Sequence, residues 1–170
     1  MKPHKSEYNP WYQGYIDQVK EDEILLTALE KDGAAFARFL RQIPSEKRSY
    51  KYADDKWTIV QMLQHIIDTE RIMSYRALTV AREDKTSMPG FDENTYAKAA
   101  EGHIENWDNM IHEWLILRQA TTLMFKSFDS HALTQIGLAN NAPISVNALV
   151  HIIIGHVRHH QNILQTRYLN

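Results

Sequence analysis

The stretch from Ser145 to Arg167, S-V-N-A-L-V-H-I-I-I-G-H-V-R-H-H-Q-N-I-L-Q-T-R, decides how the rest of the chain is interpreted. At 3.6 residues per turn it predicts a helix with an apolar stripe along one face. His156 and His160 lie on or beside that stripe, so both imidazoles are expected to face inward. His151 projects from the opposite face and His159 lies at the boundary. The two pairs of histidines are therefore expected to have different roles.

The inward pair has the spacing of a shared metal site. His156 and His160 are four residues apart, which places the two side chains one above the other and lets two nitrogens share one ion. The chain holds nine histidines in 170 residues, so one pair at this spacing is about what chance delivers. A metal site therefore needs a third ligand from another helix.

Composition indicates a single globular domain over residues 1–170, with 44% hydrophobic and 24% charged residues. The formal net charge of -2 offers no electrostatic footprint for nucleic acid or for an anionic membrane. No apolar run approaches the ~18 residues that span a bilayer, and the polar start M-K-P-H-K-S-E-Y is unlike a secretory signal, so the cytoplasm is the expected location. There is no cysteine, so any metal must be held by nitrogen and oxygen ligands.

Hydrophobic periodicity predicts four amphipathic helices of about 20 residues. The second begins with a capping box formed by Thr58 and Gln61, and its apolar residues cover much of its circumference. Ser145 is a favourable cap for the fourth. The four helices are expected over residues 22–41, 58–81, 106–128 and 145–167.

The connections favour an all-α fold. No segment has a convincing strand pattern, and residues 129–143 are expected to form a loop. The connection between the second and third helices is long and contains the turn signal Met88-Pro89-Gly90, followed by a predicted short helix at residues 92–96. The first twenty residues are expected to form an aromatic arm, packed on the body or on a second subunit. The sequence predicts a four-helix bundle, in which metal sites are built from side chains on facing helices.

His65 is the preferred third ligand because it lies inside a well-capped helix. Periodicity does not place it on the strongest apolar stripe, so its orientation stays open at this point. His103, His112 and His131 are competing candidates. The alternative without a metal is that His65 forms hydrogen bonds within the bundle and the pair on the last helix packs in the core.

Several short motifs, in this order along the chain, resemble those of the DinB superfamily. They are Lys56-Trp57-Thr58, His65-Ile66-Ile67-Asp68-Thr69-Glu70-Arg71, Pro89-Gly90-Phe91-Asp92, Arg118, Gly155-His156-Val157-Arg158-His159-His160 and Arg167-Tyr168-Leu169. The resemblance covers nearly the whole chain and implies a four-helix bundle of DinB-like type, frequently dimeric, with a divalent nickel or zinc ion. It also implies that the metal ligands are His65, His156 and His160. A homodimer and a small-molecule substrate are therefore the expected partners.

Two kinds of function follow from such a site. A divalent ion on neutral imidazoles lowers the pKa of water or of a thiol, which predicts either hydrolysis or transfer of a low-molecular-weight thiol. The absence of an H-E-x-x-H motif disfavours a zincin protease, and no general base is evident. The alternative is a non-enzymatic metal-binding dimer with a structural or stress-response role, and a metal-free interaction module is a third. Coordination positions that face a cavity would favour the enzyme.

Other polar residues near the candidate ligands have structural and functional interpretations. Asp68, Glu70 and Arg71 are expected to form salt bridges within the bundle, with orientation of a ligand or of a substrate as the functional alternative. His159 is expected to pack at a partly exposed position, with proton relay as the alternative. Three tryptophans are expected in the core or at an interface: Trp57, Trp107 and Trp114.

Overall fold

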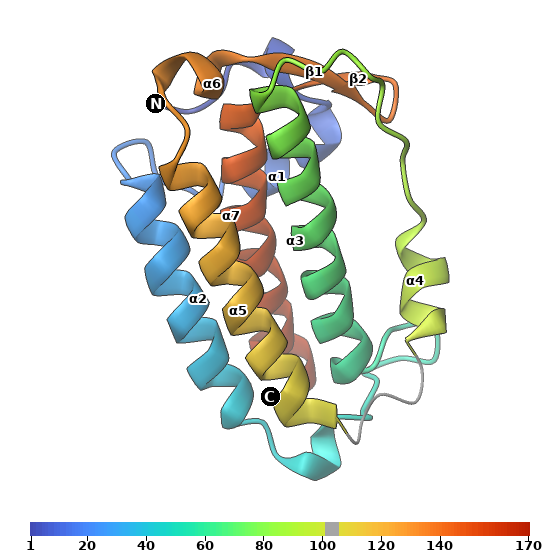
Figure 1. Ribbon diagram of the computed structural model, residues 1–170. Coiled ribbons are helices and arrows are strands. Elements are labelled where there is room, and N and C mark those ends of the chain that lie inside the picture. Colours follow the sequence, from blue (N-terminus) through green and yellow to red (C-terminus); the bar gives the residue numbers. More distant parts are fainter. Residues whose placement is uncertain (101–105) are drawn as a thin grey trace.

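The computed structural model describes residues 1–100 and 106–170. Four long helices lie side by side, and shorter elements cover one end and one side of them (Figure 1). The long helices are α2 (Leu25–Arg41), α3 (Ile59–Ala81), α5 (Trp107–Lys126) and α7 (Val146–Ile163). The shorter elements are α1 (Gln13–Ile16), α4 (Glu93–Ala99), α6 (Ser130–Thr134), β1 (Ile136–Ala139) and β2 (Ala142–Ser145), with 3-10 turns at Lys5–Glu7, Pro10–Tyr12 and Ser45–Lys47 and a π-helical end at Leu164–Tyr168. The predicted four-helix bundle is confirmed.

The order of the helices explains the long connection. Helices α3 and α5 run in the same direction, opposite to α2 and α7 (Figure 1). Helix α2 packs against α5 and α7, and α3 packs against the same two, so α2 and α3 occupy opposite corners. Because α3 and α5 are parallel, the chain must return along the 23 residues of α3, a length of about 35 Å, before α5 begins. Helix α4 lies in this return and packs on α3.

The helix starts follow the predicted caps. The Thr58 hydroxyl accepts a hydrogen bond from the Gln61 amide at 3.1 Å, and the Gln61 side-chain oxygen accepts one from the Thr58 amide at 2.8 Å. The Ser145 hydroxyl caps α7 by accepting from the Ala148 amide at 2.9 Å. Helix α2 starts at Leu25, later than the periodicity predicts, and Glu23, which lies before the helix, forms an ion pair with Arg158.

The expectation that the chain has no strand is wrong between α5 and α7. Residues 136–145 form an antiparallel hairpin, with pairs from Ile136 and Ser145 to Ala139 and Ala142. Its turn residues, at positions 140 and 141, have φ angles of 51° and 59°. Both are asparagines, which adopt left-handed geometry more readily than most residues, and two-residue hairpin turns require that geometry. Two adjacent asparagines between short apolar runs were the signal in the sequence.

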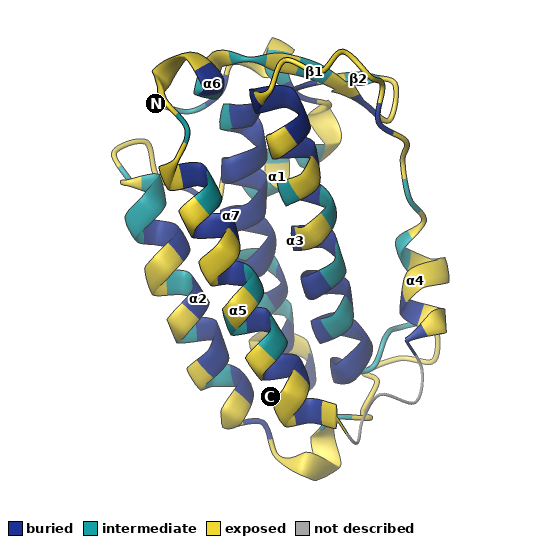
Figure 2. Ribbon diagram, viewed as in Figure 1, coloured by how far each residue is buried: buried dark blue, intermediate teal, exposed yellow. Residues whose placement is uncertain are grey.

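The N-terminal arm packs on the body of the chain through α1, which contacts α7. Burial follows the inner faces of the helices, and α7 is buried over most of its circumference (Figure 2). The buried apolar residues form two clusters toward opposite ends of the bundle. In α7 the boundary between them falls at His156, since Ile154 belongs to one cluster and Val157 to the other. None of the helices in the described ranges combines the length and the apolar character that a membrane span needs.

Candidate metal centre

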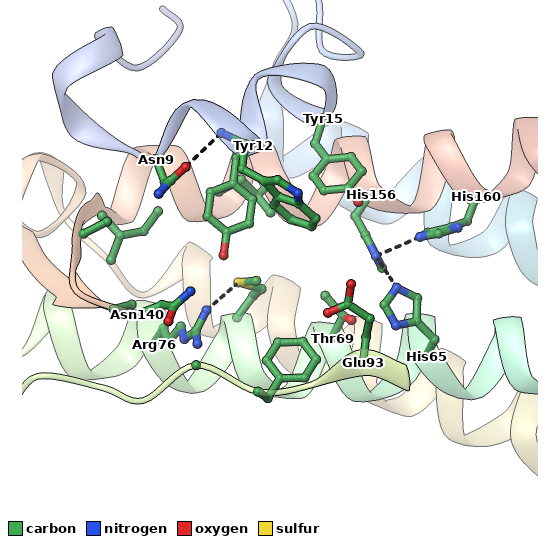
Figure 3. Close-up of a pocket in the computed structure, with 18 of the residues that line it drawn as sticks. Asn9, Tyr12, Tyr15, His65, Thr69, Arg76, Glu93, Asn140, His156 and His160 are labelled. Carbon is green, nitrogen blue, oxygen red and sulfur yellow. Dashed lines mark hydrogen bonds between the residues drawn. The ribbon is translucent and has the colours of Figure 1, made fainter. Parts of the chain in front are cut away.

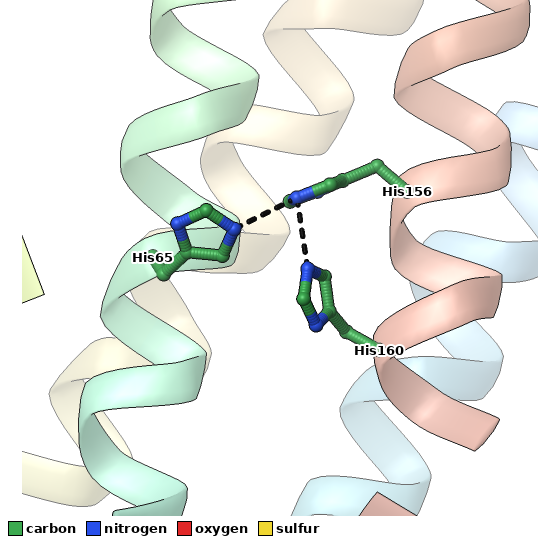
Figure 4. A group of neighbouring side chains, drawn as sticks. All are labelled: His65, His156 and His160. Carbon is green, nitrogen blue, oxygen red and sulfur yellow. Dashed lines mark hydrogen bonds between the residues drawn. The ribbon is translucent and has the colours of Figure 1, made fainter. Parts of the chain in front are cut away.

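Three imidazoles from two helices converge between the halves of the core. His65 extends from α3 toward His156 and His160 on α7 (Figure 4). The Nε2 atom of His156 lies 2.9 Å from Nε2 of His65 and 3.0 Å from Nε2 of His160. All three side chains are buried, with exposed fractions of 8%, 4% and 6% for His65, His156 and His160. The three residues each offer a ring nitrogen within 4.8 Å of the others.

Packing fixes the orientation of these rings. Helices α3 and α7 lie side by side, so the histidine face of α7 is directed at α3. The ring centroid of Trp57 lies 4.7 Å from that of His65, and the centroid of Tyr15 lies 5.2 Å from that of His156. The Nδ1 atom of His160 is buried and has no hydrogen-bond partner among the described residues. Ring contacts, not a hydrogen bond at Nδ1, therefore hold this imidazole in place.

Burial keeps the three imidazoles neutral. It lowers the pKa of His65 from 6.5 to about 4. Burial, followed by the charges of neighbouring imidazoles, holds the pKa of His156 and of His160 well below the ordinary value. Near neutral pH each ring therefore keeps a lone pair for a cation. Burial also raises the pKa of Tyr15 to about 12, so the neighbouring hydroxyl stays protonated.

The three nitrogens fit a divalent ion. Imidazole nitrogens bind zinc at about 2.0–2.1 Å, which separates two nitrogens of a tetrahedral site by about 3.3 Å. The separations of 2.9 and 3.0 Å are a few tenths of an ångström shorter, so a small outward movement of the rings would admit the ion. Within residues 1–100 and 106–170, no other group of histidines and carboxylates has the geometry to hold a metal. Imidazole is a suitable ligand for zinc and for nickel.

Two of the three competing histidines lie away from this cluster. His112 and His131 are exposed at the surface, and His131 contacts Glu83 at 3.2 Å. His103 lies outside the described residues. His151 projects from the other face of α7, as expected, but is buried under the N-terminal arm, where its Nδ1 donates a hydrogen bond of 2.8 Å to the Asn147 carbonyl.

His159 is half-buried, as the sequence predicts. Its ring makes edge contacts with Tyr15 and His160, with centroids 5.3 and 5.0 Å away. It therefore packs beside the cluster without joining it.

Two of the charged residues that follow His65 pair with α5, and the third, Asp68, has its partners on α3 itself. Glu70 forms a buried ion pair with Arg118 of α5, at 2.6 Å between Oε2 and Nη2. Arg71 pairs with Glu113 of α5 at 2.6 Å, and the Asp68 carboxylate accepts from the Gln64 amide. The predicted salt bridges within the bundle are confirmed. None of these three charged residues of α3 lines the cavity described next.

A cavity of about 480 Å³ opens beside the histidines. Its wall is formed by the N-terminal arm, α3, the long connection, the β-hairpin and α7 (Figure 3). His65, His156 and His160 lie at one end of it. Among the described residues that line it, Glu93 is the one carboxylate and Arg76 the one cationic side chain.

Sequence reasoning missed most of this wall. Thr69, Met73 and Arg76 line the cavity with His65 because they follow it by four, eight and eleven residues on one face of α3. That spacing was a usable signal. Glu93 reaches the cavity from the long connection, and no periodicity could have placed it there.

Fold and site together define a class: a four-helix-bundle protein with three buried histidines that could hold a divalent metal ion beside a cavity. A sequence model of the DinB superfamily matches residues 28–164. The chain belongs to the DinB superfamily, as its motifs suggested.

The fold is shared with a solved structure. It is YfiT from Bacillus subtilis, described as a probable metal-dependent hydrolase with an unusual four-helix bundle topology. The TM-score is 0.73 and the sequence identity 14%, over 97% of this chain and 92% of that chain. No curated protein matches this sequence.

Proposed function

We propose that this protein is a metal-dependent enzyme that activates water or a low-molecular-weight thiol, with nickel or zinc held by His65, His156 and His160. The observation that carries the proposal is the cluster of three histidines, each with a ring nitrogen within 4.8 Å of the others, at the wall of a cavity of about 480 Å³. A volume of this size suits a small organic molecule. The description of YfiT as a probable metal-dependent hydrolase supports the same kind of chemistry.

A divalent ion on three neutral imidazoles supplies Lewis-acid chemistry, lowering the pKa of water or of a thiol toward neutrality. The aromatic rings of Tyr15 and Trp57 pack on His156 and His65 at that end of the cavity. The protonated hydroxyl of Tyr15 is available as a hydrogen-bond donor.

Glu93 is the proposed proton acceptor. It lines the cavity and lies at the same end as the three histidines (Figure 3). Burial is the main cause of the raised pKa of Tyr15, and the negative charge of Glu93 raises this pKa further. The Glu93 carboxylate therefore lies near the Tyr15 hydroxyl. A carboxylate in this position can take the proton that the nucleophile loses.

A purely structural metal site is less consistent with this geometry. Structural zinc sites are closed by four protein ligands, whereas catalytic sites keep a position for water or substrate. Within the part of the chain that the structure describes, the group consists of three histidines, and no fourth histidine or carboxylate completes the coordination.

The test is a screen of metal-loaded protein against hydrolysable esters and amides and, in parallel, against a small thiol with an electrophile. We expect turnover in one arm, abolished in His156→Ala and preserved in His112→Ala, which removes an exposed histidine of α5. Equal turnover by wild type and His156→Ala would contradict the proposal. Stoichiometric metal without turnover in either arm would favour the non-enzymatic alternative.

A further inference from the structure

Arg76 of α3 is a buried cation without a counter-charge. Its side chain is 3% exposed, and no carboxylate lies within ion-pair distance of it among the described residues. The other buried arginine, Arg118, is paired with Glu70, and the half-buried Arg158 is paired with Glu23 and Asp32. Of the two fully buried arginines among the described residues, Arg76 is therefore the one without a carboxylate partner.

The contacts of its guanidinium leave donors free. Nη2 donates to the Pro89 carbonyl at 2.7 Å, and Nη1 contacts the Met73 sulfur at 3.7 Å. A guanidinium has five N–H donors, so three have no partner among the described residues. Removing a charge from water is costly unless an opposite charge and hydrogen bonds compensate it. A ligand with an anionic group would supply both.

Arg76 shares the cavity with the histidines but lies at its other end. His65 and Arg76 are on one face of α3, eleven residues and about 16 Å of helix rise apart. Figure 3 shows Arg76 beside Asn140 at the end opposite the three histidines, with Asn9 also on that side. The Asn9 side-chain oxygen accepts from the Trp11 amide, which leaves its NH₂ group as a further donor.

We infer that the Arg76 end of the cavity is a subsite for the carboxylate of an elongated small-molecule substrate. The planar guanidinium matches the geometry of a carboxylate, and the amides of Asn9 and Asn140 add neutral donors beside it. The reacting atom of the substrate then lies at the histidine end. Glu93 lies at that end, so the anionic group is drawn to Arg76 and away from Glu93. The role of the subsite in turnover rests on the proposed function; its anion binding does not.

The binding test uses succinate, with succinamide as the uncharged probe. Both are titrated calorimetrically into the metal-loaded wild type, Arg76→Met and Arg76→Lys, and into His160→Ala, which is expected to hold no metal. Arg38→Met removes an exposed arginine of α2 and is the matched control. We expect succinate to bind wild type, Arg38→Met and His160→Ala alike, and roughly ten- to a hundredfold more weakly to Arg76→Met. Arg76→Lys should recover part of the affinity, and succinamide should bind none of the proteins measurably.

The outcomes separate this subsite from the metal site. Equal succinate binding by wild type and Arg76→Met overturns the inference, and so does the absence of saturable binding to wild type. Loss of succinate binding in His160→Ala, with binding kept in Arg76→Met, would assign the carboxylate to the metal and leave the proposed function standing. With a substrate from the activity screen, Arg76→Met should raise KM for the acid and leave KM for its amide unchanged, with kcat altered less than KM.

Discussion

The Cα atom of Gly155 lies directly against the main-chain carbonyl of Tyr15, so that a methyl group at position 155 would lie 1.9 Å from the oxygen. This contact lets α1 approach the helix that carries His156, the next residue in sequence. The Tyr15 ring then rests on the rings of His156 and His159. Because position 155 of α7 carries no side chain, α1 can approach closely enough for Tyr15 to form one wall of the candidate site.

Gly155→Ala should therefore destabilise the protein, although alanine favours a helix over glycine by about 1 kcal/mol. The methyl group collides with backbone, which cannot move as a flexible side chain does, so we expect a net loss of roughly 1–3 kcal/mol. Chemical denaturation measures it. Gly14→Ala in α1 is the matched control, because a methyl group there meets nothing within 4 Å. Equal stability of the two variants would contradict the account of the arm.

The buried pair of Glu70 and Arg118 predicts a second stability effect. Each side chain is almost fully buried, so Glu70→Gln leaves an uncompensated cation in the core and should cost about 3–5 kcal/mol. Arg71→Ala breaks the more exposed pair with Glu113 and should cost about 0–1 kcal/mol. The double variant Glu70→Leu with Arg118→Met should recover much of the loss. Urea unfolding midpoints distinguish these cases, and similar losses in Glu70→Gln and Arg71→Ala would refute the assignment.

The buried imidazoles predict acid sensitivity in the metal-free protein. Burial lowers the pKa of His65 from 6.5 to about 4, so between these values the unfolded chain binds a proton that the folded chain does not. Stability should therefore fall as the pH drops from 6.5 to 4, by about 1.4 kcal/mol per pH unit from His65 alone. His156 and His160 act with the same sign. Denaturation midpoints at pH 7 and pH 5 test this, and unchanged midpoints would count against neutral buried imidazoles.

A homodimer is a further prediction, made from the family resemblance. Large apolar side chains are exposed on the neighbouring helices α3 and α5, among them Tyr75, Ile116 and Leu123, and contact with a second copy would remove them from water. Sedimentation equilibrium should give twice the chain mass of 19.9 kDa. A mass of one chain at working concentration would exclude the dimer.

Much of the fold could be predicted from local chemistry. The caps at Thr58 and Ser145 and the apolar periodicity place the long helices within a few residues of their bounds, because these signals act within one turn of chain. The inward direction of His156 and His160 follows from the stripe of α7 in the same way. The hairpin was missed because its strands are only four residues long and its turn has two asparagines and no glycine.

The other residues of the site could not be predicted without knowing how the helices pack against one another. Helix α3 is buried on several sides, so no single stripe identifies the face that meets α7, and the direction of His65 is fixed only by packing. Glu93 lies on the connection that returns along α3. Arg76 looks like any other helix arginine in the sequence, and only its position in the wall of the cavity identifies it as a site residue. Neither position follows from periodicity alone.

The central claim is that three imidazoles hold one divalent ion, and metal analysis of the untagged protein tests it most directly. Elemental analysis should find about one nickel or zinc ion per chain in wild type and in His131→Ala, which removes an exposed histidine, and almost none in His160→Ala. A wild-type protein that takes up no divalent ion, or a His160→Ala variant that retains a full equivalent, would contradict it.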